Sequence, residues 1–441
     1  MVKDIERLSR EELERLQKKR LRSTLRLAYE KTRLYREKFK QAGVRPSDIK
    51  TYDDLVRIPF SSKEDFVRDY LAPIASRVSV WHTTSGTSGL PSIIGFSDND
   101  LEAQTSMEER NLRVIGVTAQ DVVHNVTPYG MFFAGICLHE GTRRLGATVI
   151  PAGKLPTSKQ QAMVVDVFKP TVILGVPQFI LKLSYVYEKE IGKDPRKSSL
   201  RLAYALGEAL PDVVREKLEQ RWGIEVRIGY GLTEAGSAAE CEEKNGVHWP
   251  EDHTLVEVID PKTGERVSDG EEGELVFTTL TRTGTIAIRF RSNDFSRAIL
   301  EECSCGRTLL RLAPPKYRLD DLVKIRGTLT SPYAIDSAIF EFPEIRNYLF
   351  VVDKDLSGIV DLIKIFVEAD YRDPKTIERL SEKLGGGICV TPNMIKYVPL
   401  GSIPTIGRKE VRFIDLRKDT PYKDAVMEFM SRFESGIAHG V

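Results

Sequence analysis

Short apolar segments alternate with helical segments between residues 121 and 228, and this alternation constrains the fold more than any other feature. Strands are expected at 121–127, 147–151, 171–176, 202–207 and 224–228. The intervening residues have the apolar spacing and length of helices. Strands that alternate with helices favour parallel sheets covered on both faces. The sequence therefore predicts an α/β fold for this part of the chain.

The pattern changes twice further along the chain. From residue 253 the strands are joined by hairpin turns, which predicts a β-rich subdomain over about 253–317. A small α+β domain should follow, with its last strand at 394–398. We therefore expect a large domain over 1–318 and a small, mobile C-terminal domain over 319–441. The length of 441 residues agrees with two or three domains.

Charge and hydropathy exclude several classes of partner. The formal net charge is +1, which favours neither nucleic acid nor an anionic membrane as a partner. No apolar run approaches the roughly 20 residues that span a bilayer, and the first residues lack a signal-peptide core. Five cysteines in so long a chain do not indicate a disulfide framework. A cytoplasmic protein is expected.

A loop rich in Ser, Thr and Gly runs from Thr83 to Pro91. Glycines allow the backbone close to a ligand, and hydroxyls add donors beside the main-chain N–H groups, so such a loop suits a polyphosphate. A flexible surface loop is the alternative. A short helix should precede it, with a capping box formed by Ser61 and Glu64.

A second motif, Gly229-Tyr230-Gly231-Leu232-Thr233-Glu234, directly follows the fifth strand. Ligands of parallel α/β sheets gather beyond the carboxyl ends of the strands. Tyr230 could stack on a base, and Glu234 offers a hard oxygen ligand for Mg²⁺. A tight turn with an exposed acid is the alternative. Asp294, after a later strand, could accept two ribose hydroxyls or simply form a turn.

The order of these motifs resembles the adenylate-forming enzymes, and the phenylacetate–CoA ligase family of aryl-CoA ligases in particular. Supporting phrases are Gly207-Glu208-Ala209-Leu210-Pro211, Gly231-Leu232-Thr233-Glu234, the run from Glu271 to Leu280, and Cys303-Ser304-Cys305-Gly306. The resemblance implies an AMP-forming ligase. Such an enzyme activates an aryl or arylacetic acid with ATP and Mg²⁺ as an acyl-adenylate, and then transfers the acyl group to coenzyme A.

The resemblance also implies roles for individual residues. ATP would be bound by Ser85, Gly86, Thr87, Ser88, Gly89, Glu208, Tyr230, Gly231, Asp294 and Arg318. The catalytic residues would be Thr233 at the α-phosphate, Glu234 on Mg²⁺, and Lys409 between the acyl carboxylate and the α-phosphate. Asp320 would be the hinge of the small domain. The acyl pocket would be lined by Tyr129, Phe132, Phe133 and Ala134.

Two positions depart from the family pattern. Leu90 stands where the loop often has a lysine, and Asn293 replaces the glycine that usually precedes the ribose aspartate. The first departure predicts a weaker positive charge in the loop. The aspartate itself, Asp294, is retained.

Cys303 and Cys305 place two soft ligands one residue apart. With Cys241 and His248 they could form a tetrahedral Zn²⁺ site, an arrangement that some members of the family resemble. Unpaired thiols are the alternative, and His253 could replace His248. A structural zinc would pin the β-rich subdomain to the nucleotide loop.

Two other functions remain open from the sequence. One is an adenylyltransferase acting on a deazaflavin cofactor, and the other is a nucleotide-binding protein without turnover. Lys409 and Glu234 favour the ligase over the second of these, because a pure nucleotide sensor needs neither residue. The partners expected are a small carboxylic acid, ATP and coenzyme A, and a homodimer is left open.

Overall fold

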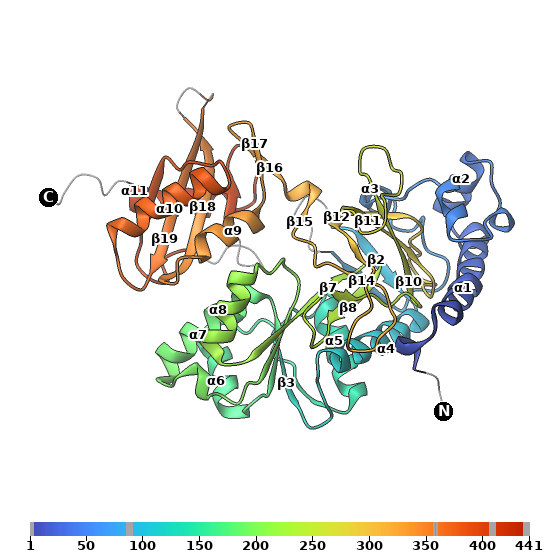
Figure 1. Cartoon of the computed structure of the whole chain (residues 1–441), viewed down its shortest axis with the longest axis horizontal. Coiled ribbons are helices and arrows are strands. Elements are labelled where there is room, and N and C mark those ends of the chain that lie inside the picture. Colours follow the sequence, from blue (N-terminus) through green and yellow to red (C-terminus); the bar gives the residue numbers. More distant parts are fainter. Residues whose placement is uncertain (1–3, 85–90, 356–357, 359, 405–411, 435–441) are drawn as a thin grey trace. The chain divides into compact units, whose positions relative to one another are not determined.

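The computed structural model describes residues 4–84, 91–355, 358, 360–404 and 412–434. The chain forms two compact units (Figure 1). The first contains residues 1–175, 186–209 and 222–320, and the second contains 176–185, 210–221 and 321–441. Helices α7 (Pro177–Ile191) and α8 (Asp212–Trp222) therefore contribute residues to both units.

A nine-stranded mixed sheet forms the centre of the first unit, in the order β13-β14-β9-β8-β7-β6-β5-β3-β4. Its five parallel strands are β7 (Glu225–Leu232), β6 (Leu202–Ala205), β5 (Val172–Gly175), β3 (Val122–Asn125) and β4 (Thr148–Ile150). The antiparallel strands are β8 (Gly236–Glu240), β9 (Val247–His248), β14 (Arg311–Leu312) and β13 (Ala298–Ile299). The predicted α/β alternation is confirmed at each of the five expected strands.

Helix α4 (Asp98–Val114) precedes the parallel strands, and α5 (Phe133–Leu145), α6 (Ser158–Phe168), α7 and α8 connect them. Helices α4 and α5 pack unusually close together. A Cβ atom on Gly141 of α5 would lie 2.6 Å from Cβ of Glu108, so only glycine allows this approach. The close packing buries the polar residues that α4 directs toward β8.

The β-rich part of the first unit is a four-stranded antiparallel sheet, in the order β10-β11-β12-β15. Its strands are β10 (Thr254–Ile259), β11 (Gly273–Thr279), β12 (Phe290–Ser296) and β15 (Tyr317–Arg318). Residues Ala287–Phe290 also have the composition of a strand, but β12 begins only at Phe290. Arg289 has a left-handed backbone with φ 45°, which interrupts an extended chain just before that point.

Helices α1 (Arg10–Lys31), α2 (Arg33–Gln41) and α3 (Lys63–Arg68) form the N-terminal region, and the hairpin β1 (Val80–Thr83) and β2 (Ile93–Phe96) flanks the Ser/Thr/Gly loop. The predicted capping box of Ser61 and Glu64 is wrong by one residue. Asp65 accepts the N–H of Ser62 at 3.1 Å, while the Ser61 hydroxyl donates to the carbonyl of Ile288 at 2.7 Å. Ser61 therefore joins the N-terminal region to the chain just before β12.

The second unit is built on a four-stranded sheet in the order β20-β19-β18-β21. Its strands and helices are β18 (Ile345–Lys354), β19 (Asp361–Ala369), β20 (Met394–Tyr397), β21 (Phe413–Asp415), α9 (Pro332–Phe340), α10 (Pro374–Gly387) and α11 (Lys423–Glu434), and the hairpin β16 (Val323–Ile325) and β17 (Thr328–Thr330) precede them. The strand expected at 394–398 is present, but it is not the last. Strand β21 pairs in parallel with β18, and α11 packs its Val426, Phe429 and Met430 into the core of the unit.

None of the described helices combines the length and apolar character needed to cross a bilayer.

Candidate functional site

The motif Gly229–Glu234 lies at the end of β7 and in the turn that follows it. Residues through Leu232 remain in the strand, because Gly229–Leu232 pair antiparallel with Gly236–Ala239 of β8. Only Thr233, Glu234 and Ala235 form the turn. Gly231 is required for this pairing, since a Cβ there would lie 2.9 Å from Cβ of Ser237. The motif is thus a strand end with a short turn, rather than a loop beginning after the strand.

Three of the residues predicted to bind ATP lie together in the first unit. The hydroxyl of Tyr230 donates to Oδ2 of Asp294 at 2.7 Å. Asp294 and Arg318 are cross-strand partners in β12 and β15, and Nε of Arg318 lies 3.7 Å from Oδ1 of Asp294. Burial of the hydroxyl, together with the charge of Asp294, raises the pKa of Tyr230 well above its usual range. Tyr230 is therefore a neutral donor near pH 7.

Asn293 shows why the family's glycine is dispensable here. The residue has φ 64°, in the left-handed region that glycine favours and that asparagine tolerates better than most residues. Its backbone N–H donates to Oε1 of Glu274 at 3.1 Å. The backbone shape before Asp294 is therefore kept with asparagine.

Glu234 is buried, with 6% of its surface exposed. Burial raises the pKa of its carboxyl, and a backbone N–H bond and the charge of Arg318 oppose that rise. A buried acid with a raised pKa binds a proton more readily until a cation takes its place. Burial therefore favours the protonated form of Glu234 when no cation is nearby.

Polar residues of α4 bind Ser237, which lies in β8 just after the Thr233–Glu234 turn. The sequence reasoning missed these α4 residues. Oε1 of Glu108 accepts the hydroxyl of Ser237 and, at 3.0 Å, the amide of Gln104. The amide of Asn111 donates to Oγ of Ser237 at 3.0 Å. Gln104, Glu108 and Asn111 recur at helical spacing, so polar residues on one face of a predicted helix were the available signal.

Of the remaining predicted ATP-binding, catalytic and hinge residues, Glu208 and Asp320 are described by the structure, and the others are not. Glu208 is half-buried just after β6, and Asp320 accepts Nε of Arg318 at 3.0 Å. Ser85, Gly86, Thr87, Ser88, Gly89 and Leu90, and also Lys409, lie outside the described residues. The described ends of the Ser/Thr/Gly loop are close together, since the N–H of Thr84 donates to the carbonyl of Ser92 at 3.1 Å.

The four residues predicted to line an acyl pocket have different surroundings. Phe133 is buried against Phe96, with ring centroids 4.1 Å apart, and against His82 at 4.8 Å. The half-buried Tyr129 accepts the amide of Asn125 at 3.0 Å through its hydroxyl. Phe132 and Ala134 are half-buried at the start of α5. Phe133 thus belongs to the hydrophobic core on at least one of its sides.

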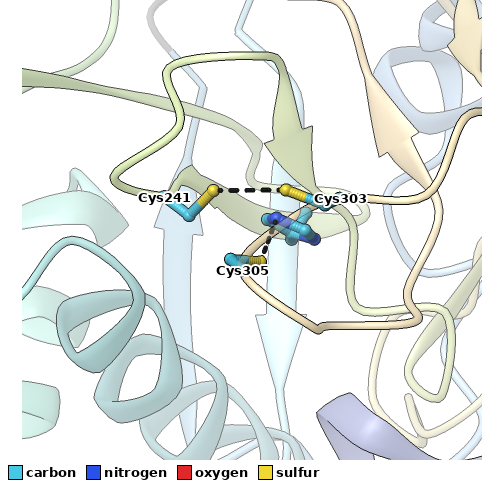
Figure 2. Close-up of side chains that lie close together, drawn as sticks. Cys241, Cys303 and Cys305 are labelled. Atoms are coloured by element: carbon cyan, nitrogen blue, oxygen red, sulfur yellow. Dashed lines mark hydrogen bonds between the residues drawn. The ribbon is translucent and has the colours of Figure 1, made fainter.

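A second cluster brings together Cys241, His248, Cys303 and Cys305, and Figure 2 shows the three labelled cysteines converging. One ligand atom from each residue lies within 4.8 Å of the other three. Sγ of Cys241 is 3.7 Å from Sγ of Cys303, and Sγ of Cys305 is 3.4 Å from Nε2 of His248. His253 lies elsewhere, with Nδ1 at 3.0 Å from the hydroxyl of Thr281.

The electrostatics of this cluster favour a neutral imidazole. Burial, together with the charges of Arg307 and Arg311, lowers the pKa of His248 to about 4. Burial raises the pKa of Cys241 to about 12. Burial also acts to raise the pKa of Cys305, but hydrogen bonds from Arg307 outweigh it and the pKa falls. His248 is therefore unprotonated near pH 7, as metal ligation requires.

The cluster is connected to Tyr230 through β9 and Trp249. Trp249 follows His248, and its ring lies 5.8 Å from that of Tyr230 and 4.8 Å from that of Phe277. Its indole N–H donates to the carbonyl of Thr254 at 3.0 Å. Cys241 directly follows β8, the strand that pairs with the Tyr230 strand. A change in the cluster can therefore reach Tyr230 through one packed residue.

Comparison with known proteins gives consistent matches. The family model described as AMP-binding enzyme matches residues 4–281. A phenylacetate-coenzyme A ligase of Thermus thermophilus is 33% identical over 94% of this chain and 99% of its own length. One from Aromatoleum evansii is 36% identical over 87% and 89% of the two chains. The fold is similar to a solved 2-hydroxyisobutyryl-CoA ligase in complex with 2-HIB-AMP, with a TM-score of 0.85 and 24% identity over 97% of this chain and 94% of that one.

Proposed function

We propose a substrate class, residue roles and a metal for this chain, which belongs to the phenylacetate–coenzyme A ligase family and is an AMP-forming acid–CoA ligase. The substrate class is an aryl or arylacetic acid. The observation that carries it is the 33–36% identity to phenylacetate-coenzyme A ligases over most of the chain. Neither a deazaflavin adenylyltransferase nor a non-catalytic nucleotide-binding protein is favoured by these matches.

The pairing of Tyr230, Asp294 and Arg318 supports a site for the nucleoside of ATP. A carboxylate offers about four acceptor positions, so Asp294 could accept ribose hydroxyls as well as the Tyr230 hydroxyl. The half-buried ring of Tyr230 and the carboxyl of Glu208 would flank the adenine, and Gly231 would leave room beside them. Arg318 would hold the ribose, and Ser85–Gly89 would grip the β- and γ-phosphates.

Thr233 and Glu234 would act at the reacting phosphate. The hydroxyl of Thr233 would donate to the α-phosphate, and the carboxylate of Glu234 would hold Mg²⁺ beside it. When bound, Mg²⁺ offsets the negative charge that opposes attack by the substrate carboxylate. Release of pyrophosphate would leave the acyl-adenylate, and the thiol of coenzyme A would then displace AMP.

Lys409 would neutralise charge between the acyl carboxylate and the α-phosphate, and its segment is anchored on both sides in the second unit. On one side, Glu368 accepts the N–H of Ile403 at 2.7 Å. On the other side, Nε of Arg412 donates to the side-chain oxygen of Asn347 at 2.8 Å. Asp320, the last residue of the first unit, would serve as the hinge for a mobile small domain.

Tyr129, Phe132, Phe133 and Ala134 would border the acyl group. Aromatic and apolar walls with few polar groups suit a phenyl ring. The Tyr129 hydroxyl is restrained by Asn125 and lies 3.3 Å from Nδ1 of His139, so the ring of Tyr129 has a defined orientation. A rigid aromatic side chain of this kind can discriminate between flat and branched acids.

Zn²⁺ fits the donor set of Cys241, His248, Cys303 and Cys305. With Zn–S bonds of about 2.3 Å, two sulfur ligands of a tetrahedron lie about 3.8 Å apart. Cys241 and Cys303 are 3.7 Å apart, close to this separation. The ion would stabilise the β8–β9 hairpin and so help to hold Trp249 against Tyr230. Three thiolates and one imidazole make this a structural site without an open position.

A pyrophosphate-release assay over a panel of carboxylic acids tests the proposed function. Phenylacetate and other aryl acids should give release that requires ATP and Mg²⁺, with steady turnover only when coenzyme A is present. Branched aliphatic acids serve as the matched comparison. No pyrophosphate release with any acid would contradict the ligase function. Equal rates of release with aliphatic and aryl acids would contradict the substrate class. Lys409→Ala should abolish adenylation while a supplied acyl-adenylate still reacts with coenzyme A.

A further inference from the structure

Arg282, in the segment after β11, is a buried arginine without a carboxylate at hydrogen-bonding distance among the described residues. Only 6% of its surface is exposed, and its Nη1 atom has no hydrogen-bond partner within the described ranges. Burial lowers the pKa of its guanidinium, while the charges of Asp100 and Glu234 oppose this effect. Burying a cation without a hydrogen-bonded anion beside it costs folding free energy. Stability alone therefore does not account for an arginine at this position.

The contacts of Arg282 lead to the Thr233–Glu234 turn. Its Nη2 atom donates to the carbonyl of Thr233 at 3.2 Å and to Oε1 of Gln104 at 3.3 Å. Its guanidinium carbon lies 4.2 Å from the centre of the Phe96 ring, which fixes the plane of the group. The guanidinium therefore joins helix α4 to the backbone of Thr233.

The backbone around Arg282 is itself fixed to the start of α4. The carboxylate of Asp100 accepts the N–H of Thr283 at 2.7 Å and that of Gly284 at 2.8 Å. A Cβ on Gly284 would lie 2.4 Å from the carbonyl oxygen of Gly95, so this close approach of the two backbones requires glycine. Arg282 thus extends from a rigid base toward the turn.

Helix α4 holds the turn at its other end as well. Ser237, three residues after Glu234, bonds to Glu108 and Asn111 of α4. Gln104 lies between the two attachments, since it accepts Arg282 and donates to Glu108. The five residues from Thr233 to Ser237 are therefore fixed at both ends by one face of a single helix.

We infer that Arg282 is a positioning residue for adenylation, which orients Thr233 and the metal ligand Glu234 through the Thr233 carbonyl. This inference rests on the proposed Mg²⁺ role of Glu234. Groups that orient metal ligands typically change metal affinity or activity by about 10- to 100-fold when removed. Both hydrogen bonds leave the single nitrogen Nη2, at the far end of a guanidinium that lies over Phe96. Lysine keeps the charge of Arg282, but its side chain is shorter and it has no planar group to stack on that ring. Arg282→Lys therefore keeps the positive charge at this position and changes only the geometry of its hydrogen bonds and its packing on Phe96.

The test compares the two half-reactions in the full-length protein. Arg282→Lys should lower the rate of acid-dependent pyrophosphate release by about 10- to 100-fold. It should also raise the Mg²⁺ concentration needed for half-maximal rate. Transfer of the acyl group from a supplied acyl-adenylate to coenzyme A should change much less, because that step follows the departure of pyrophosphate.

Arg289→Lys is the matched control. Arg289 is also buried and also donates to backbone carbonyls, those of Val56 and Ile58, but it contacts neither Thr233 nor α4 in any described interaction. This control should lose stability without a change in Mg²⁺ response. An equal loss of both half-reactions in Arg282→Lys, or a wild-type Mg²⁺ response, would overturn the inference.

Equilibrium binding of ATP at varied Mg²⁺ gives a readout that needs no acid substrate. Wild type and Arg282→Lys should differ in the Mg²⁺ dependence of ATP binding, while wild type and Arg289→Lys should agree. If no acid supports turnover in the wild type, the proposed function fails and this comparison still decides the role of Arg282. If the Mg²⁺ dependence of all three proteins agrees, the positioning role fails and the ligase function is unaffected.

Discussion

Two buried polar clusters of the first unit, one on helix α4 and one formed by cysteines and His248, differ in the kinds of polar atoms that face one another. In the α4 cluster, the carboxylate of Glu108 faces donors from Gln104, Asn111 and Ser237. In the cysteine cluster, three sulfurs and one imidazole nitrogen lie within 4.8 Å of one another, and the closest pairs are sulfur–sulfur and sulfur–nitrogen. Thiolates and a neutral imidazole are metal ligands, whereas a carboxylate that faces hydrogen-bond donors is satisfied without a cation. The first arrangement holds a backbone turn, and the second is suited to a metal ion.

The largest expected effect comes from removing the metal of the cysteine cluster. Purified protein should contain one equivalent of Zn²⁺, and Cys303→Ser should lose it, because a serine hydroxyl is a poor ligand for Zn²⁺ at neutral pH. Structural zinc contributes about 10–16 kcal/mol of apparent binding free energy in zinc-finger peptides. Metal analysis and thermal unfolding would measure both effects.

Cys389→Ser is the control for that experiment, since Cys389 is exposed and lies outside the cluster. This variant should keep its zinc and its thermal stability. Wild-type protein without stoichiometric zinc, or Cys303→Ser with full zinc content, would contradict the zinc assignment.

The α4 cluster should respond to pH instead. Burial raises the pKa of Glu108 above its usual 4.5, so the folded state holds the proton more tightly than the unfolded state. The stabilisation from protonated Glu108 is complete below pH 4.5 and is lost as the pH rises through the folded-state pKa. Glu108→Gln, which cannot ionise, should therefore gain stability relative to wild type as the pH rises above 4.5.

Denaturant unfolding between pH 4.5 and 8 would measure this difference. Glu108→Ala is the companion variant, and it should lose about 1–3 kcal/mol because it leaves buried donors unpaired. A difference between Glu108→Gln and wild type that does not vary with pH would show that Glu108 titrates alike in both states.

The smallest expected effect is a difference in cysteine reactivity. Arg307 lowers the pKa of Cys305 against the effect of burial, whereas burial and Glu108 raise the pKa of Cys137 well above its usual range. After removal of the metal, iodoacetamide should modify Cys305 faster than Cys137 near pH 7, because the thiolate is the reactive form. Mass spectrometry of the modified peptides would measure the rates, with the exposed Cys389 as the reference. Equal protection of Cys305 with and without zinc would contradict its role as a ligand.

Much of the fold could be predicted from local pattern. The five parallel strands followed from apolar segments that alternate with helices, because each such segment must be buried on both faces of a sheet. The predicted helix cap at Ser61 was wrong by one residue. Ser61 and Ser62 are adjacent and have the same side chain, and only the hydrogen bond from Ser61 to Ile288 shows that Ser61 is not the cap. Strand β21 was missed because its three residues are too few for periodicity to indicate.

The candidate site divides in the same way. Short motifs identified Tyr230, Glu234 and Asp294, and the spacing of Cys303 and Cys305 suggested soft metal ligation before any fold was known. The roles assigned to these residues stay predictions until the assays above are made. Asn293, which departs from the family pattern, is explained by its left-handed backbone.

By itself, the sequence determined the succession of strands and helices between residues 121 and 228, the family, and which side chains carry suitable chemistry, because these depend on residue type and local spacing. Tertiary structure alone decided which polar residues are buried together. Arg282 lies 49 residues from Thr233 and 178 residues from Gln104 in the sequence. Burial makes their hydrogen bonds strong and their loss costly, and burial is a property of the packed fold rather than of any one segment.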